Sequence, residues 1–277
     1  MNAEKPLEGL AILVTRPERQ AESFCALIEA KGGEAVRFPT LDIRACDSKG
    51  SVFSKPENLN TFDWLVFISA NAVYFALKAC ENIPMIPAHL RVAAIGEATA
   101  LALEQSGIAV DLVPRERFNS EAFLALQEMQ SVAGQRFLIV RGPGGREMLA
   151  DTLSERGAHV MYAEVYQRLR PAVDIESHLR AWQERGIDAV TIFSGESLIN
   201  FVAMLGDKGM AWARNIPLAV AGERIAERVE SEGFKKVILA VNATEGALFE
   251  ALTRISDPEQ AEGLGSGRNE LTMPLSE

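Results

Sequence analysis

The sequence predicts an α/β protein with two similar lobes, each a doubly wound parallel sheet, that arose by internal duplication and are joined by a two-stranded linker. Three observations support this prediction. The chain has 277 residues, which exceeds the usual size of one domain. Short apolar runs alternate along it with patterns of helical period, as in doubly wound sheets. The landmarks of the first half also recur in the second half.

The repeat consists of five pairs of landmarks, separated by a nearly constant spacing of about 125 residues. Along each half they are an opening apolar run, a glycine turn, an apolar run that ends in Ser, an apolar run that ends in Gly-Glu, and a polar segment before a helical pattern. The pairs are 11–17 with 137–143, Gly33 with Gly157, 63–71 with 188–196, 92–100 with 218–226, and 118–121 with 242–245. Because all five occur in one order, we interpret the halves as copies of one unit.

The predicted strands are continuous apolar runs at 10–14, 64–68 and 92–95. Strands that helices bury on both faces have this pattern, whereas strands with one wet face alternate. Between the runs lie helical patterns, in which residues such as Ala21, Phe24 and Ile28 fall on one helix face. The connections are expected to be right-handed crossovers, so the strands of each sheet should be parallel.

Two extended, alternating segments interrupt this order, at 35–43 and 160–168. They occupy equivalent places in the two halves, which favours a two-stranded connection between the lobes. The first lobe is then discontinuous and combines 1–39 with 168–256, and the second lobe is 40–167. The segment 257–277 is rich in Pro, Gly, Ser and Glu, has no periodicity, and is predicted to be a flexible tail.

The composition argues against several functional classes. A formal net charge of −10 disfavours binding to nucleic acid or to an anionic membrane, because such binding depends on neutralising phosphates. No apolar run reaches the length of a membrane span and no secretion signal is apparent, so a cytoplasmic protein is expected. The cysteines Cys25, Cys46 and Cys80 are widely spaced, which indicates incidental thiols. The histidines lack metal-ligand spacing, so no metal site is predicted. A monomer is expected, because no extra apolar stretch suggests an interface.

Ligands of doubly wound sheets bind outside the carboxyl ends of the strands, so the residues that follow each strand are the candidates. We expect the ligand in the crevice between the lobes. Ser69 and Asn71 follow one apolar run, and Ser194, Gly195 and Ser197 follow the equivalent run of the second half. At such a turn Ser caps the helix, and the first backbone N–H groups can bind an anion. Capping alone would explain one isolated Ser, whereas the repetition favours anion binding.

Glycines follow the next pair of predicted strands. Gly96 precedes Thr99, and Gly222 occupies the equivalent position of the second half. A glycine lets a ligand approach the backbone closely, and Thr99 adds a hydroxyl group. A tight turn alone would explain the glycines but not Thr99, which is therefore a candidate binding residue.

The segment 15–18 and the Gly-rich segment 141–147 supply the candidate arginines. Thr15 and Glu18 have the spacing of a capping box, and Arg16 between them is a candidate to bind a carboxylate. The segment 141–147 matches no nucleotide-binding fingerprint and is interpreted as a turn that aims Arg141 and Arg146 at carboxylates.

Tyr166 is a further residue that could carry chemistry, because it has an ionisable hydroxyl group on the predicted linker. The alternative is a tyrosine that packs at the hinge, with its hydroxyl group satisfied locally.

In this combination the motifs resemble those of the uroporphyrinogen-III synthase family. They are L-V-T-R-P at 13–17, F-x-S-x-N at 67–71, G-x-x-T at 96–99, N-S-E at 119–121, R-G-x-x-x-R-E at 141–147 and V-Y-Q at 165–167. Each motif is loose by itself, and the likeness extends in order over most of the chain.

The resemblance implies an enzyme of tetrapyrrole (haem) biosynthesis without metal or organic cofactor. Such an enzyme cyclises hydroxymethylbilane to uroporphyrinogen III and inverts ring D through a spiro intermediate. The resemblance also implies that Tyr166 assists departure of the substrate hydroxyl group, and that polar residues face the cleft, namely Ser69, Thr99, Ser194 and Ser197. Relatives often have hydroxyl residues after the second glycine, where this chain has Glu223-Arg224-Ile225.

Two alternative functions are left open by the residues. A non-catalytic, two-lobed binding protein for an anionic small molecule would use the same hinge and helix termini, although the usual secretion signal of such receptors is missing. A nucleotide-dependent enzyme would share the sheets, but it would require the phosphate-binding motifs that the sequence lacks.

Overall fold

The computed structural model describes residues 5–46, 52–54, 56–80, 86–115, 117–145 and 147–255. The chain divides into two compact units, of which unit 1 comprises Met1–Asp42 with Leu169–Glu277 and unit 2 comprises Ile43–Arg168. The sequence-based divisions, after residues 39 and 167, differ from these by one to three residues. The predicted tail, 257–277, lies outside the described residues.

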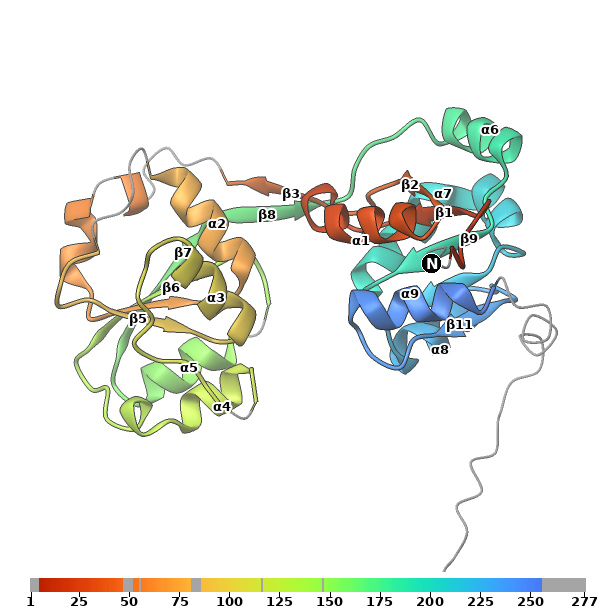
Figure 1. Cartoon of the computed structure of the whole chain (residues 1–277). Coiled ribbons are helices and arrows are strands. Elements are labelled where there is room, and N and C mark those ends of the chain that lie inside the picture. The colour runs from red at the N-terminus through yellow and green to blue at the C-terminus, as the bar shows by residue number, and fades with distance from the viewer. Residues whose placement is uncertain are drawn as a thin grey trace, which may run out of the picture. The chain divides into compact units, whose positions relative to one another are not determined.

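Unit 1 contains a five-stranded parallel sheet with helices on both faces (Figure 1). Its strands lie in the order β11-β10-β9-β1-β2 and comprise Val237–Leu239, Leu218–Val220, Ala189–Ile192, Ala11–Val14 and Glu34–Arg37. One face packs against α1 (Glu18–Ala30) and α9 (Glu245–Thr253). The other packs against α6 (Ile175–Arg185), α7 (Gly195–Ala213) and α8 (Glu223–Ser231). Burial on both faces explains why the central strands are continuously apolar.

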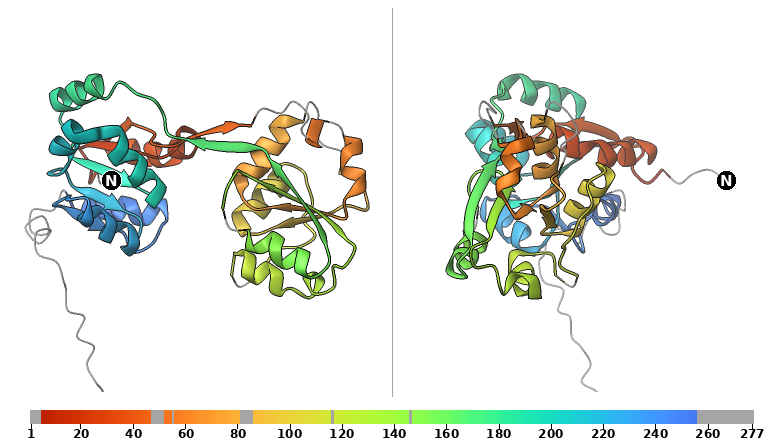
Figure 2. Two further views of the ribbon diagram at one scale, coloured as in Figure 1. Left: turned by 180° about the vertical axis from the view of Figure 1, so that it is seen from behind. Right: turned by 90° about the vertical axis from the view of Figure 1, so that its left-hand side faces the viewer.

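Unit 2 contains a four-stranded parallel sheet in the order β5-β4-β6-β7, comprising Arg91–Ala94, Trp64–Phe67, Arg136–Arg141 and His159–Glu164. One face packs against α2 (Ala70–Ala79) and α3 (Glu97–Gln105), and the other against α4 (Ser120–Ala125) and α5 (Met148–Glu155) (Figure 2). Short 3-10 helices span Val52–Ser54, Pro56–Thr61 and Gln127–Met129. This sheet too is doubly wound, because α-helices cover both of its faces.

The two sheets have the same strand order when the sequence landmarks are paired. The landmarks match β4 with β9, β5 with β10, and β6 with β1, and the strands that follow, β7 and β2, lie at equivalent edges. At the opposite edge, an isolated parallel bridge between Ala93 and Leu112 occupies the place that β11 has in unit 1. Parallel order places all the carboxyl ends of one sheet at the same edge.

A separate two-stranded sheet is formed by β3 (Asp42–Ala45) and β8 (Tyr166–Leu169), where the chain passes between the units (Figure 1). The predicted linker segments were therefore too long. Their first parts enter the parallel sheets as the edge strands β2 and β7. Both edge strands are partly exposed, and this exposure produces the alternation that resembled a free-standing ribbon.

The predicted capping box at α1 is wrong. Pro17 occupies the N-cap position, and no side chain caps the helix. Thr15 is fully buried, and its Oγ1 donates a hydrogen bond to the carbonyl oxygen of Thr191 at 2.6 Å. Because Thr15 continues the buried β1, its hydroxyl group needs a local partner, and the neighbouring strand supplies one. No described helix is long and apolar enough to cross a membrane.

Candidate functional site

The predicted binding residues lie at the carboxyl ends of the strands in each unit. In unit 2, Ser69 follows β4, Thr99 lies in the first turn of the helix after β5, and Arg141 is the last residue of β6. In unit 1, Arg16 follows β1 and Ser194 follows β9. Each sheet is parallel, so each unit gathers its own residues at one edge.

Serine caps a helix at this edge of each unit. The Oγ of Ser69 accepts the backbone N–H of Ala72 at 3.2 Å, at the beginning of α2. The Oγ of Ser194 accepts the backbone N–H of Ser197 at 3.1 Å, at the beginning of α7. Capping satisfies one of the first N–H groups, and the helix dipole favours an anion near the others. The capping interpretation of both serines is confirmed.

The remaining residues of these two turns lie beside their caps. Asn71 is half-buried in the first turn of α2, and Gly195 is the first residue of α7. A Cβ atom built at Gly195 would meet no atom within 4 Å, so the space beside this turn is open. Ser197 is buried, and its hydroxyl group lies 3.1 Å from that of Ser194.

The helices that follow β5 and β10 begin without a side-chain cap. Gly96 and Gly222 occupy their N-cap positions. Thr99 is 5 % exposed in the first turn of α3, and its N–H donates to the carbonyl oxygen of Gly96 at 3.0 Å. In these two helices no side chain takes up the first backbone N–H groups, which lie at the carboxyl ends of the strands.

Tyr166 lies beside Ser69 within unit 2. Its side chain is 3 % exposed, and its ring stacks on that of Phe75 with centroids 5.7 Å apart. The Tyr166 Oη and the Ser69 Oγ are 3.3 Å apart, and either oxygen can be the donor. The guanidinium group of Arg168 lies 6.0 Å from the ring centroid. The structure thus brings together two residues that the sequence placed almost a hundred positions apart.

Arg141 is buried, with 4 % of its surface exposed, and is held by its own loop. Its Nε donates to the carbonyl oxygen of Gly142 at 3.0 Å, and its Nη1 lies 3.1 Å from the Oε1 of Glu147. The guanidinium group also lies over the ring of Tyr162, 4.5 Å from the centroid. A buried arginine needs such partners, because an unpaired charge in this position would be very costly.

Tyr162 and Glu147 were missed by the sequence reasoning. The hydroxyl group of Tyr162 donates a hydrogen bond to the Oε2 of Glu147. Burial, followed by this hydrogen bond, raises the pKa of Tyr162 to about 12. The hydrogen bond from Tyr162, followed by the charge of Arg141, lowers the pKa of Glu147. The register of β6 and β7, which sets Ile139 opposite Tyr162, is the signal that would have placed this tyrosine near Arg141.

A cavity of about 260 Å³ opens beside this network. Its polar lining includes Arg141 and Tyr162 together with Asn119 and Ser120, and its apolar lining includes Ile68. A larger groove of about 670 Å³ runs along 110–115 and Arg117 beside α4, and none of the described site residues lines it. The predicted binding residue Arg146 lies outside the described residues.

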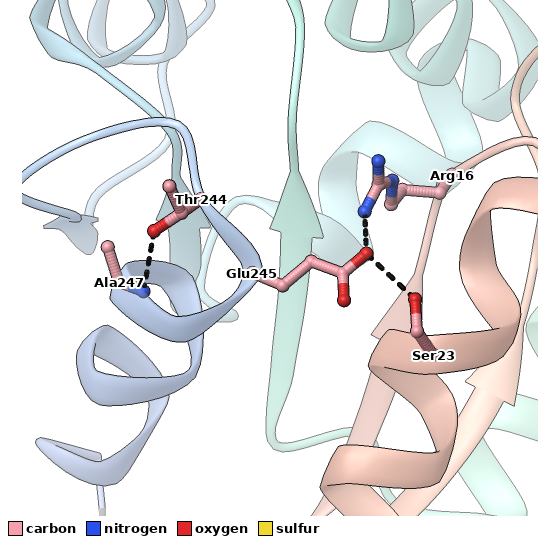
Figure 3. Close-up of polar contacts among 5 residues, drawn as sticks. All are labelled: Arg16, Ser23, Thr244, Glu245 and Ala247. Atoms are coloured by element: carbon pink, nitrogen blue, oxygen red, sulfur yellow. Dashed lines mark hydrogen bonds and ion pairs between the residues drawn. The ribbon is translucent and has the colours of Figure 1, made fainter. Parts of the chain in front are cut away.

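Arg16 is held in unit 1 by an ion pair with Glu245, the first residue of α9 (Figure 3). The side chains are 20 % and 32 % exposed. The same Oε1 of Glu245 accepts the hydroxyl group of Ser23 at 3.0 Å, and the guanidinium group lies 4.2 Å from the ring centroid of Phe193. Because Glu245 engages Nη1, the rest of the guanidinium fork is the part that a ligand could use.

Within the described residues, no group of three or more His, Cys, Asp and Glu side chains could hold a metal ion. The buried thiol of Cys25 has a raised pKa because burial disfavours its thiolate. The candidate residues described in each unit supply hydroxyl groups, backbone donors and an arginine.

Comparison with known proteins identifies a family. The family model of uroporphyrinogen-III synthase HemD matches residues 22–250. The uroporphyrinogen-III synthase of Salmonella typhimurium is 34% identical over 249 residues, covering 88% of this chain and 100% of that protein. The enzyme of Escherichia coli is 34% identical over 248 residues, with the same shares covered.

Solved structures share the fold. Uroporphyrinogen-III synthetase from Helicobacter pylori is 16% identical, with a TM-score of 0.58 over 88% of this chain and 98% of that chain. A mutant uroporphyrinogen III synthase from Thermus thermophilus is 18% identical, with a TM-score of 0.54 over 89% of this chain and 98% of that chain. The family match over most of the length, the full-length relatives and the parallel α/β fold agree, and the chain belongs to the uroporphyrinogen-III synthase family.

Proposed function

We propose that this protein carries out the reaction of its family through Tyr166 and the helix termini described above. That reaction is a cofactor-independent cyclisation of hydroxymethylbilane to uroporphyrinogen III, a lyase step of haem biosynthesis. The observation that carries the assignment is the 3.3 Å contact between the Tyr166 and Ser69 hydroxyl groups at the beginning of α2. It places a proton donor beside a helix terminus that favours anions.

The substrate is an anionic linear tetrapyrrole with carboxylates along its length. Helix N-termini hold carboxylates through uncharged N–H donors, so a protein with a net charge of −10 can still bind it. The candidate donors are the first turns that contain Asn71 and Thr99 in unit 2, and Gly195 and Ser197 in unit 1. Arg16 adds a charge-assisted hydrogen bond in unit 1.

Arg141 has a different role in this proposal. Its guanidinium group faces the cavity of about 260 Å³ and is already neutralised on one side by Glu147. A carboxylate that entered this cavity would meet the guanidinium N–H groups of Arg141 that Glu147 does not occupy, and the side chain of Tyr162. Such a fixed fork orients a side chain of the substrate, because arginine bonds a carboxylate in a planar, paired geometry.

Proton transfer from Tyr166 begins the reaction. The Tyr166 hydroxyl group gives its proton to the hydroxyl group of the substrate. The C–O bond then breaks, water departs, and the substrate becomes an azafulvene cation. Ser69 supports this step, because its single proton can point to the Tyr166 oxygen while its lone pair accepts the Ala72 N–H. In that orientation the proton of Tyr166 is free for the substrate, and the tyrosinate that forms is stabilised.

The cation is then attacked by the substituted carbon of ring D, which gives the spiro intermediate. Fragmentation and reclosure invert the ring, and the proton released on rearomatisation returns to Tyr166. Holding the chain in this bent form is an orientation effect, worth up to about 7–11 kcal/mol for well-aligned groups. The anion-binding turns therefore serve catalysis as well as binding.

The equal strand orders of the two sheets support an origin of the two units by internal duplication. Duplication would also account for the serine caps at β4 and β9, which occupy equivalent strand ends. Each unit then carries the same kind of anion-binding edge.

The isomer of the product tests the proposed function. Hydroxymethylbilane closes spontaneously to the non-inverted type I ring, so the purified protein should yield the type III isomer on chromatography. Binding of hydroxymethylbilane with only type I product would support the alternative, a non-catalytic binding protein for an anionic small molecule. A thermal shift with micromolar ATP or NAD would instead favour a nucleotide-dependent enzyme.

A further inference from the structure

The ring of Tyr166 fills a narrow slot between Phe75 and the loop that follows β6. Phe75 stacks on it with centroids 5.7 Å apart. On the loop side lies Gly142, and a Cβ atom built there would lie 2.6 Å from Cε2 and 2.7 Å from Cζ of Tyr166. Real Cβ atoms essentially never approach so closely, so the ring and any side chain at 142 exclude each other.

The backbone of Gly142 does not itself require glycine. Gly144 and Gly145 in the same loop have φ angles of +71° and +102°, which other residues rarely adopt, whereas Gly142 is not among the described glycines with positive φ. The three atoms nearest to the added Cβ all belong to Tyr166. The closest atoms that a side chain at 142 would meet are therefore those of the tyrosine ring.

We propose that Gly142 is a positioning residue for the reaction, and that its missing side chain lets the Tyr166 ring enter far enough to set its hydroxyl group beside Ser69. This inference rests on the proposed acid role of Tyr166. It adds a requirement that the family match does not state, because it concerns the shape of the slot and not a group that touches substrate.

The loop cannot easily retreat from an added methyl group. The carbonyl oxygen of Gly142 accepts the Nε of Arg141 at 3.0 Å, and Arg141 is itself paired with Glu147. Arg141 is buried at the end of β6, which pairs with β7 over its length and with β4 through 137–140. Because both the strand and the loop are tied down, the tyrosine ring must move, and its hydroxyl group moves with it.

The test is a double-mutant cycle of Gly142→Ala and Tyr166→Phe, with the isomer assay as readout. Gly142→Ala should lower kcat by about 10²-fold with little change in KM, since a displacement near 1 Å can cost that much. In the Tyr166→Phe background the same substitution should change kcat by less than about twofold, because no hydroxyl group remains to be misplaced. Gly246→Ala, at a helical glycine whose added Cβ meets nothing within 4 Å, controls for the substitution itself and should keep wild-type turnover.

Each outcome separates the two proposals. Equal loss of kcat in both backgrounds would mean general damage to the fold and would overturn the positioning role. Wild-type kcat for Gly142→Ala, with a large loss for Tyr166→Phe, would also overturn it and leave the acid role intact. Wild-type kcat for Tyr166→Phe would instead overturn the acid role, whatever Gly142→Ala does.

A stability measurement covers the case in which Gly142→Ala does not fold. Tyr166→Ala removes the ring, and the methyl group of Gly142→Ala then enters the space that the ring vacated. The double variant should melt at a temperature no lower than Tyr166→Ala alone. A lower melting temperature would show that the methyl group meets something other than the tyrosine, and would overturn the inference.

Discussion

The hydroxyl group of Ser69 lies 3.3 Å from that of Tyr166 while it also caps α2 through the N–H of Ala72 at 3.2 Å. One serine thus links a helix terminus to the candidate acid. The two roles can use different parts of the hydroxyl group, a lone pair for the cap and either the proton or the other lone pair for the tyrosine hydroxyl group. The sequence position of Ser69, two residues after β4, allows both at once.

Ser69→Ala should therefore lower both stability and turnover. Loss of the cap is expected to cost about 1 kcal/mol in the free energy of unfolding. Loss of the hydrogen bond to Tyr166 should lower kcat by up to about tenfold, which is the net worth of one neutral hydrogen bond. Urea denaturation and the isomer assay on one preparation measure the two effects.

Asp174→Ala is the matched control for Ser69→Ala. Asp174 caps α6 in unit 1 by accepting the N–H of Ser177, whereas Tyr166 belongs to unit 2. Its replacement should cost a similar amount of stability and leave kcat unchanged. If Ser69→Ala behaves like this control, Ser69 acts as a cap only.

Tyr166→Phe should reduce kcat while the fold is kept. The Phe ring retains the stacking on Phe75, so the melting temperature should change little. A positioned acid typically contributes about 10²–10⁴-fold, and the loss of kcat should fall in that range. Turnover equal to that of the wild type would assign Tyr166 to packing, which is the alternative that the sequence leaves open.

Arg16→Ala should raise KM with a smaller effect on kcat. A hydrogen bond to a charged group contributes about 1.5–3 kcal/mol, which corresponds to a rise of roughly 10- to 150-fold. Arg16→Lys keeps the charge without the planar guanidinium fork, so its KM should lie between those of the wild type and of Arg16→Ala. An unchanged KM for both variants would mean that Arg16 serves the ion pair with Glu245 alone.

The class of fold and the strand ends followed directly from the sequence, because burial on both faces leaves a continuous apolar run. The matched runs that became β4 and β9 are the clearest case. The linker was harder to place, because the edge strands β2 and β7 alternate much as a free ribbon does. Whether such a segment joins a parallel sheet or forms a separate ribbon depends on its pairing partner, and tertiary structure determines that partner.

The candidate site was predictable where a residue type acts alone and not where partners are distant. Ser69 and Ser194 cap their helices through local spacing, which a sequence displays. The partner of Arg16, Glu245, is separated from it by most of the chain and comes close only through the sheet order. Thr15 failed as a cap for the same reason, because its partner Thr191 lies on a neighbouring strand. Tyr162 was missed because it stands on an edge strand without a motif.

The pH dependence of Tyr162 tests the network around Arg141. Its pKa is raised to about 12, first by burial and then by the hydrogen bond to Glu147. A tyrosine whose pKa is higher in the folded than in the unfolded chain stabilises the fold in its protonated form. That contribution is fully present below the unfolded pKa of about 10 and is lost as the pH rises through about 12.

Ultraviolet titration of tyrosinate should therefore show a late step, a deprotonation near pH 12, that is absent in Tyr162→Phe. Glu147→Gln removes the charge that disfavours tyrosinate, so the same step should move toward the ordinary value of about 10. Stability measured above pH 10 should fall less steeply in Tyr162→Phe than in the wild type, because the variant has no such group to lose. A late step that survives in Tyr162→Phe would not belong to Tyr162, and the hydrogen bond between Tyr162 and Glu147 would then not explain it.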